Sequence, residues 1–311
     1  MKKIAAIFFL TAATLACAQD KATNTELILP YAAGGGVDMM GRAFAREAAR
    51  MTGQNWVVVN RDGAAGVIGF TTLARSKPDG STLVFSPASP MTNSPFLMKT
   101  MPFRNDQIEP VCQVFENVFT IAVRADSPIK SLQDLIAQAK AAPGTLSYGH
   151  AGNGSIPHLG VAAVAKALGV QFNAIPFKGD AAVLPQLMGG HLDFGAPAIS
   201  SIKDKGLRVL ALLADKRHPS MPDVPSLTDL GYPSVTPGLN GVYAPAGTPP
   251  TTLTQLQGLC QKVLESDGFK QTALGLNQVP AYLNAAQFKA RIQSTYRVHG
   301  ELVPELNLER N

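Results

Sequence analysis

The stretch Pro30-Tyr-Ala-Ala-Gly-Gly-Gly-Val-Asp38 decides the fold. An apolar run at Glu26–Pro30 leads into it and predicts a strand. Apolar residues at helix-face spacing follow it and predict a helix: Met40, Ala43, Phe44, Ala48 and Met51. Strand, glycine loop and helix start together aim free backbone N–H groups at a ligand, and the helix dipole favours an anion. The stretch therefore predicts an anion-binding loop, or, alternatively, a tight turn in which Asp38 caps its own helix.

The same stretch imitates a nucleotide-binding P-loop in Gly36-Val-Asp-Met-Met-Gly41-Arg42. Arg42 stands where that motif has its phosphate-binding lysine, and Ala43 stands where it has the metal-holding Ser or Thr. Both chemical groups that the motif needs are absent, so nucleotide binding is rejected.

Length and composition describe an ordinary globular protein. The 311 residues leave room for two domains, and 46% are hydrophobic while 16% are charged. The formal charge of +5 includes Lys2 and Lys3, and removing these two lysines leaves +3. That charge is scattered along the chain, so no nucleic-acid partner is expected.

Residues 1–18 have the pattern of a secretory signal. Lys2 and Lys3 form a basic start, Ile4–Leu10 an apolar run, and Ala16-Cys17-Ala18 a small-residue cleavage site. Cys17 also permits a lipoprotein, although Thr14 stands where such motifs usually carry an aliphatic residue. The apolar run is too short to span a membrane. We expect an exported chain that does not itself span the membrane.

Export leaves two cysteines, Cys112 and Cys260. An even count in an oxidising compartment permits a disulfide between them. The alternative is two separate buried thiols, and the sequence alone leaves both open.

The first 90 residues alternate between strand and helix signals. Further strands are expected at Trp56–Asn60 and Thr82–Ser86, with a glycine-rich helix start at Gly63–Gly69 between them. Such alternation predicts a parallel sheet of the α/β class, whose ligands lie beyond the carboxyl ends of the strands. Three loops would share that edge: Tyr31–Gly36, Arg61–Gly66 and Ser86–Ser89.

The opening design recurs later in the chain. A strand at Leu146–Tyr148 runs into the glycine-rich Gly149–Ser155, and a helix through Ala167 follows. Two halves that each offer a glycine-rich helix start can bracket a cleft with an anion at each end. A small dicarboxylate is the natural occupant of such a cleft.

These stretches, in their order and spacing, carry a resemblance to a known family. Its marks include Pro30–Asp38, Val59-Asn60-Arg61, Pro78-Asp79-Gly80, Gly154-Ser155-Ile-Pro-His158, Pro176-Phe-Lys-Gly179, Gly189-Gly190-His-Leu-Asp193, Pro222-Asp-Val-Pro225 and Pro245-Ala-Gly-Thr-Pro249. The chain resembles the substrate-binding proteins of tripartite tricarboxylate transporters, also called Bug proteins, over nearly the whole mature length.

The resemblance implies a type II periplasmic-binding-protein-like fold, with two α/β domains that close on a ligand. Residues 19–119 and 245–311 would form the first domain and 120–244 the second, with crossing strands near 119–125 and 239–244. It implies a monomer in the periplasm, without a cofactor, that captures a small carboxylate for a two-subunit membrane permease. The alternatives are a sensing protein that docks on a receptor and, third, an exported hydrolase.

The ligand-binding residues expected from the loops and the resemblance are Tyr31, Ala32, Ala33, Gly34, Gly35, Gly36, Asp38, Ser86, Ala88, Gly152, Asn153, Gly154, Ser155, His158, Lys178, Gly179 and Asp193. Several have a second interpretation. Ser155 could cap its helix, and His158 could orient the loop before it. Lys178 could pair with a carboxylate or form a surface ion pair, and Asp193 could hold an amino group or cap a turn.

The chain also departs from the family pattern. Val59 stands where an acidic residue is common, Asp62 where proline is usual, and Ala65 where glycine is usual. The segment between Asp193 and Arg208 is shorter than in the family, which leaves contacts from residues 196–201 unassigned. Catalysis is not expected, because Ser155 and His158 lie three apart without a nucleophile elbow and the histidines lack metal-ligand spacing.

Overall fold

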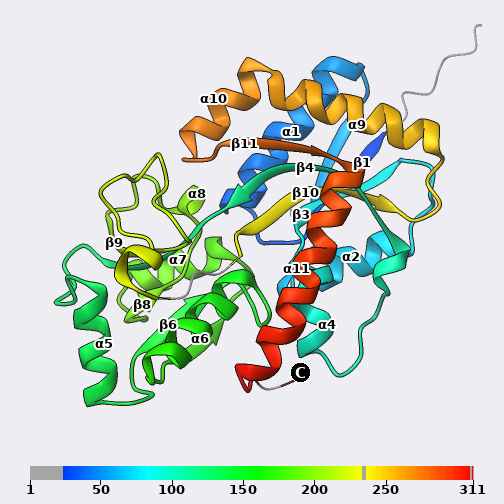
Figure 1. Ribbon diagram of the computed structural model, residues 1–311. Helices are drawn as coiled ribbons and strands as arrows, with labels where there is room; N and C mark the ends of the chain where they lie inside the picture. Colours follow the sequence, from blue (N-terminus) through cyan, green and yellow to red (C-terminus); the bar gives the residue numbers. More distant parts are fainter. Residues whose placement is uncertain (1–23, 233–235, 309, 311) are drawn as a thin grey trace, which may run out of the picture.

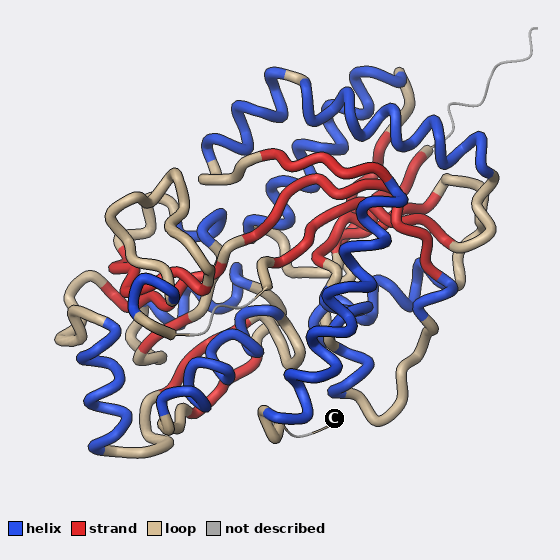
Figure 2. The backbone as a smooth tube through the Cα atoms, in the orientation of Figure 1, coloured by secondary structure: helices blue, strands red, loops and turns tan. Residues whose placement is uncertain are grey.

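The computed structural model describes residues 24–232, 236–308 and 310. The expected signal peptide and the Cys17 lipoprotein alternative lie outside the described residues. Two mixed sheets lie side by side, each covered by helices (Figures 1 and 2). The α/β class predicted from the sequence is therefore confirmed.

The larger sheet has six strands in the order β11-β4-β10-β3-β1-β2. Their bounds, in that order, are Pro280–Asn284, Ile108–Asn117, Gly238–Pro245, Thr82–Pro87, Thr25–Leu29 and Trp56–Asn60. β1 pairs in parallel with β2 and β3, as the strand and helix alternation predicted, whereas β10 pairs antiparallel with β3 and β4.

Helices cover both faces of the larger sheet because its strands are apolar on both sides. Leu27 and Leu29 of β1 face one core, which also holds Met40 and Phe44 of α1 (Gly36–Thr52). Ile28 between them faces the other core. The helices on the first face are α1, α9 (Pro250–Glu265) and α10 (Asp267–Gly275); those on the second are α2 (Val67–Ala74) and α11 (Ala285–Glu305).

The smaller sheet has five strands in the order β7-β6-β8-β5-β9. Their bounds are Asn173–Pro176, Ser147–His150, Phe194–Gly195, Phe119–Arg124 and Leu207–Leu213. The helices of this half are α5 (Leu132–Ala141), α6 (Ile156–Leu168), α7 (Asp180–Met188) and α8 (Ile199–Ile202). The remaining short elements are α3 (Ser89–Thr92), α4 (Ser94–Leu97) and three 3-10 turns, Ala64–Gly66, Asn105–Gln107 and Thr228–Leu230.

The chain passes between the sheets at Val118, because β4 pairs only in the larger sheet and β5 only in the smaller. It returns between β9 and β10. Residues 239–244, expected as a strand crossing back to the first domain, belong to β10 of the larger sheet, which is fully buried and paired on both sides. The division of the chain into domains at residues 119 and 245 remains a prediction.

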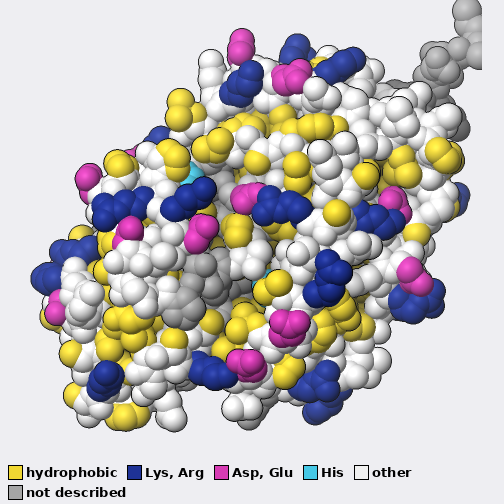
Figure 3. Space-filling model, viewed as in Figure 1, with side chains coloured by type: hydrophobic (Ala, Val, Ile, Leu, Met, Phe, Trp, Pro, Cys, Tyr) yellow, Lys and Arg dark blue, Asp and Glu magenta, His cyan; other side chains and the backbone are white. Residues whose placement is uncertain are grey.

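Two further features hold the chain together. A disulfide joins Cys112 of β4 to Cys260 of α9, with the Cα atoms 6.7 Å apart, so the C-terminal helices are tied to the larger sheet. The end of α11 bridges the two halves, since Val303 packs against Leu97 and against Leu159 of α6. Acidic and basic side chains are interspersed on the face seen in Figure 3. Among the described helices, none combines the length and apolar character that a membrane span requires.

Candidate functional site

The three loops expected at one sheet edge do meet there. The Tyr31 hydroxyl donates a hydrogen bond to the Ala65 carbonyl at 3.0 Å and lies 3.4 Å from the Ser89 hydroxyl. One side chain thus connects the loops after β1, β2 and β3. Burial raises the pKa of Tyr31 to about 12, so the phenol stays neutral at physiological pH.

The Asp38 carboxylate holds the first glycine loop in place through hydrogen bonds. Its carboxylate accepts hydrogen bonds from the Gly34 N–H and the Asn60 amide, both at 2.9 Å, and from the Arg42 guanidinium. Burial alone would raise the pKa of Asp38, but these hydrogen bonds outweigh it and hold the pKa below its usual range. The negative charge of Asp38 is therefore already satisfied by the protein.

The second glycine loop is shaped by His158. The Gly154 N–H donates to His158 Nδ1 at 3.1 Å, and the Asn93 amide donates to the Gly154 carbonyl at 2.7 Å. Burial lowers the pKa of His158 to about 4, which keeps Nδ1 free to accept. His158 thus orients the loop, one of the two roles that the sequence left open.

The Ser155 hydroxyl has no hydrogen-bond partner within the described residues, although it is buried. Ser155 is the residue before α6, yet its side chain makes no capping bond to that helix. A buried hydroxyl without a partner is costly and marks a place where a partner is missing. We therefore place Ser155 among the groups available to a ligand.

The two halves touch directly around these loops. The Ala32 N–H donates to the Lys178 carbonyl at 3.0 Å, and the Gly36 N–H donates to the Ser201 hydroxyl at 2.9 Å. Ser201 in turn donates to Asp180 at 2.8 Å. Lys178 forms a largely exposed ion pair with Asp62, its Nζ 3.2 Å from the carboxylate.

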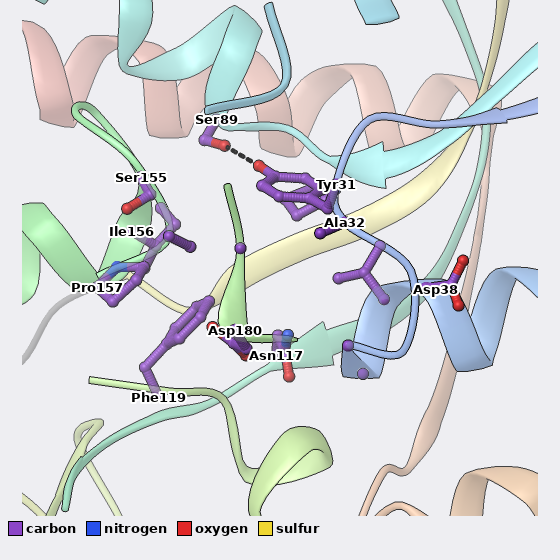
Figure 4. Close-up of a pocket in the computed structure, with 16 residues that line it drawn as sticks. Tyr31, Ala32, Asp38, Ser89, Asn117, Phe119, Ser155, Ile156, Pro157 and Asp180 are labelled. Carbon is purple, nitrogen blue, oxygen red and sulfur yellow. Dashed lines mark hydrogen bonds between the residues drawn. The ribbon is translucent and has the colours of Figure 1, made fainter. Parts of the chain in front are cut away.

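A central pocket lies between the sheets (Figure 4), and the starts of three helices line it. Gly36 and Val37 begin α1, Ile156 and Pro157 begin α6, and Asp180 begins α7. The first N–H groups of each helix lack partners within it, and each helix dipole is positive at this end. Other lining residues are Tyr31, Ala32, Gly35, Asp38, Pro87, Ser89, Asn117, Phe119, Ala151, Ser155 and Gly179. The cavity volume is ≈ 30 Å³, enough for about two water molecules.

Part of the expected site lines this pocket and part does not. Neither Ser86 nor Ala88 lines the pocket: the Ser86 hydroxyl donates to the Pro87 carbonyl, and Ala88 packs in the core on the second face of the larger sheet. Gly152, Asn153 and Lys178 line a neighbouring hollow of ≈ 310 Å³. The remaining expected residues, Ala33, Gly34, Gly154 and His158, belong to the two loops but do not line the central pocket.

Asp193 is placed away from the pocket. Its carboxylate accepts hydrogen bonds from the backbone N–H and the hydroxyl of Ser147, at 2.7 and 2.8 Å. Ser147 begins β6, and Asp193 itself precedes β8, which runs parallel to β6. Asp193 therefore lies at the amino ends of these strands, whereas the pocket lies beyond the carboxyl ends. Asp193 does not line the central pocket, and the turn-capping alternative fits its contacts.

Nine lining residues are absent from the expected set, and three of these, Asn117, Phe119 and Asp180, also lie outside every loop and motif that the sequence analysis singled out. Asn117 accepts hydrogen bonds at Oδ1 from Gln278 and Ser200, which leaves its amide N–H group to donate. Asp180 directly follows the Lys178-Gly179 pair of the family motif, and this adjacency is the signal in the sequence that could have identified Asp180 as a site residue.

The chain is similar to a known protein family and to several solved structures. The model of the tripartite tricarboxylate transporter family receptor matches residues 40–308. Protein BugT of Bordetella pertussis is 34% identical over 248 residues, covering 78% of this chain and 76% of that protein. The solved structure of the periplasmic binding protein BugD is 28% identical, with a TM-score of 0.87, and covers 93% of this chain and 99% of that one.

A second solved structure, R. palustris Rpa4515 with adipate, is 25% identical with a TM-score of 0.88, covering 93% of this chain and 99% of that one. The periplasmic-binding-protein fold and the family that the loop motifs resembled are both confirmed. The chain belongs to the receptor family of the tripartite tricarboxylate transporters, a family of solute-binding proteins.

Proposed function

We propose that this protein captures a small carboxylate in the periplasm, in the central pocket, and delivers it to a two-subunit membrane permease. The observation that carries the proposal is the meeting of three helix starts, those of α1, α6 and α7, around one pocket that also contains the unpartnered Ser155 hydroxyl. Helix starts offer N–H groups and a positive dipole end to an anion, and a serine hydroxyl donates to a carboxylate oxygen.

Binding would be coupled to closure of the two halves. The cavity of ≈ 30 Å³ is too small for a carboxylic acid of several carbons. The N–H groups of Ala32 and Gly36 are already bonded across the interface. A ligand must therefore enter an opened form and take over part of these contacts. A ligand that gains contacts from both halves shifts the equilibrium towards the closed form.

The family relationship supports the ligand class. The relative solved with adipate, a dicarboxylate, matches this chain along nearly its whole length. In this chain the first loop, the α6 start and the Gly179 turn would supply the backbone donors. Lys178 would act at the rim, because its ammonium is exposed and paired with Asp62.

The test has a binding arm and a transport arm. Mature protein is titrated calorimetrically with mono-, di- and tricarboxylates, and its retained ligand is released by denaturation and identified by mass spectrometry. Proteoliposomes that hold the cognate permease are then assayed for uptake of the identified acid. We expect micromolar or tighter binding and uptake that needs the protein. Binding of neutral solutes alone would contradict the carboxylate assignment, and binding without uptake would contradict delivery to a permease.

A further inference from the structure

Asp180 is an acidic residue inside a pocket otherwise suited to an anion. Its Oδ2 accepts hydrogen bonds from the Ala198 N–H at 2.9 Å and from the Ser201 hydroxyl at 2.8 Å. Neither partner is charged, and no Lys or Arg bridges to Asp180 within the described residues. Asp38, the other acidic residue lining the pocket, differs because Arg42 neutralises it.

The position of Asp180 follows from the fold. It is the first residue of α7, directly after Gly179, whose φ of 112° turns the chain between the end of β7 at Pro176 and the start of α7. The backbone at Ala32 packs against this turn through its bond to the Lys178 carbonyl. Asp180 is thus fixed beside the first glycine loop, on the opposite side of the interface. Burial raises the pKa of Asp180, and the hydrogen bonds from Ala198 and Ser201 act in the opposite direction.

The Ser201 hydroxyl satisfies the hydrogen-bonding groups of both Gly36 and Asp180. Its oxygen accepts from the Gly36 N–H at 2.9 Å, while its hydrogen is donated to Asp180 at 2.8 Å. The Gly36 N–H therefore needs an acceptor and the Asp180 carboxylate needs a donor, and the Ser201 hydroxyl between them fills both the acceptor position and the donor position. A carboxylate alone fills the acceptor position but places its charge beside Asp180, and like charges at such separations repel strongly away from bulk water.

We propose that Asp180 makes the pocket select carboxylates that carry a protonated amine on the adjoining carbon, in preference to the same acids without the amine. The carboxylate would accept from the helix-start N–H groups, and the ammonium would donate to Asp180. Only two atoms separate a carboxylate oxygen from such an amine, so one ligand could meet both Gly36 and Asp180, which the Ser201 hydroxyl now connects through bonds of 2.9 and 2.8 Å. The inference rests on the proposed function and narrows its ligand class.

Matched pairs of acids test the proposal. Wild-type protein is titrated with propionate and alanine, succinate and aspartate, glutarate and glutamate, and 3-phenylpropionate and phenylalanine. The members of each pair differ only in the amine. We expect the amino acid to bind about tenfold to a hundredfold tighter in the pair that fits best, as a hydrogen bond between two charged groups allows.

The variant Asp180→Asn should reduce that preference to about threefold or less, by weakening the amino acid and strengthening the plain acid. Asp215→Asn removes an acidic residue from an exposed loop and serves as the matched control, which should keep the full preference. Circular dichroism melting of both variants verifies that they are folded.

Three results would overturn the proposal. The first is a plain acid that binds as tightly as its amino partner in every pair that binds, and the second is an Asp180→Asn variant that keeps the preference. The third is tighter binding of the plain acids as pH falls in the wild type but not in Asp180→Asn, which would make Asp180 a neutral donor. In all three cases carboxylates still bind, so the proposed function survives. If no carboxylate of either kind binds, both proposals fail.

Discussion

Replacing Gly36 with alanine, which adds one methyl group, should weaken ligand binding while the protein still folds. It is the first residue of α1 and has a helical conformation that alanine adopts freely, so the helix itself tolerates the change. A Cβ at this position would lie 2.6 Å from Ser200 Cβ and 3.0 Å from the Ser201 hydroxyl. Carbon atoms pack best at about 3.5–4.0 Å, so α8 would have to retreat by about 1 Å.

This clash raises the free energy of the closed form alone, because α1 and α8 are in contact only when the two halves are closed. Overpacking of the added methyl group against α8 in the closed form costs about 1–3 kcal/mol. Since about 1.4 kcal/mol corresponds to a factor of ten, the middle of that range weakens ligand binding by about tenfold to a hundredfold. Small-angle scattering should show a radius of gyration that stays near the open value at ligand concentrations that compact the wild type.

Gly258→Ala is the matched control. Gly258 lies inside α9, is exposed, and a Cβ there would meet no atom within 4 Å. Affinity and compaction should therefore stay close to wild type. The reasoning fails if Gly36→Ala binds like the wild type, or if Gly258→Ala loses as much affinity as Gly36→Ala.

Three further predictions concern single features of the structure. Ser155→Ala should leave the melting temperature of the unliganded protein unchanged or higher, because a buried unpartnered hydroxyl is removed, yet weaken binding about tenfold; a drop in melting temperature would instead indicate a capping role. Reduction of the Cys112–Cys260 disulfide should lower the free energy of unfolding by about 2–5 kcal/mol in urea titrations, and equal stability with and without reductant would show that the bridge contributes nothing. The free energy of unfolding should also fall as pH drops from 6.5 to about 4. Three buried histidines, His150, His158 and His299, have pKa values lowered to about 3 or 4, so the unfolded chain binds protons first. A flat profile over that range would contradict their burial as neutral rings.

Local sequence signals predicted helices and the sheet edge at which the loops meet. The spacing of Met40, Ala43 and Phe44 located α1 and its buried face. Capping boxes, a pattern readable in sequence, are formed at Ser131 and Asn284, the residues before α5 and α11. The edge rule for parallel strands placed three loops together, and the Tyr31 hydroxyl joins them. These features depend on short-range periodicity or on strand direction, which the sequence carries.

Long-range features were not predictable in the same way. β4 contains Pro110, which argues against a strand, but it is tolerated because β11 pairs only further along, at residues 112–115. Without β4, Asn117 could not be placed at the pocket. Asp180 looks like an ordinary acidic residue at a helix start, which is favourable for the dipole. Only the packing of α7 against the first glycine loop makes it part of the site.

The central claim is that a small carboxylate binds between the sheets at the helix starts. The most direct measurement is a calorimetric titration of the mature protein and of Gly36→Ala, side by side, with the acid identified by release from the purified protein. The account predicts saturable one-to-one binding to the wild type and a dissociation constant at least about tenfold higher for the variant. Equal dissociation constants for the two proteins would place the ligand elsewhere, and absence of any carboxylate binding to the folded wild type would contradict the account as a whole.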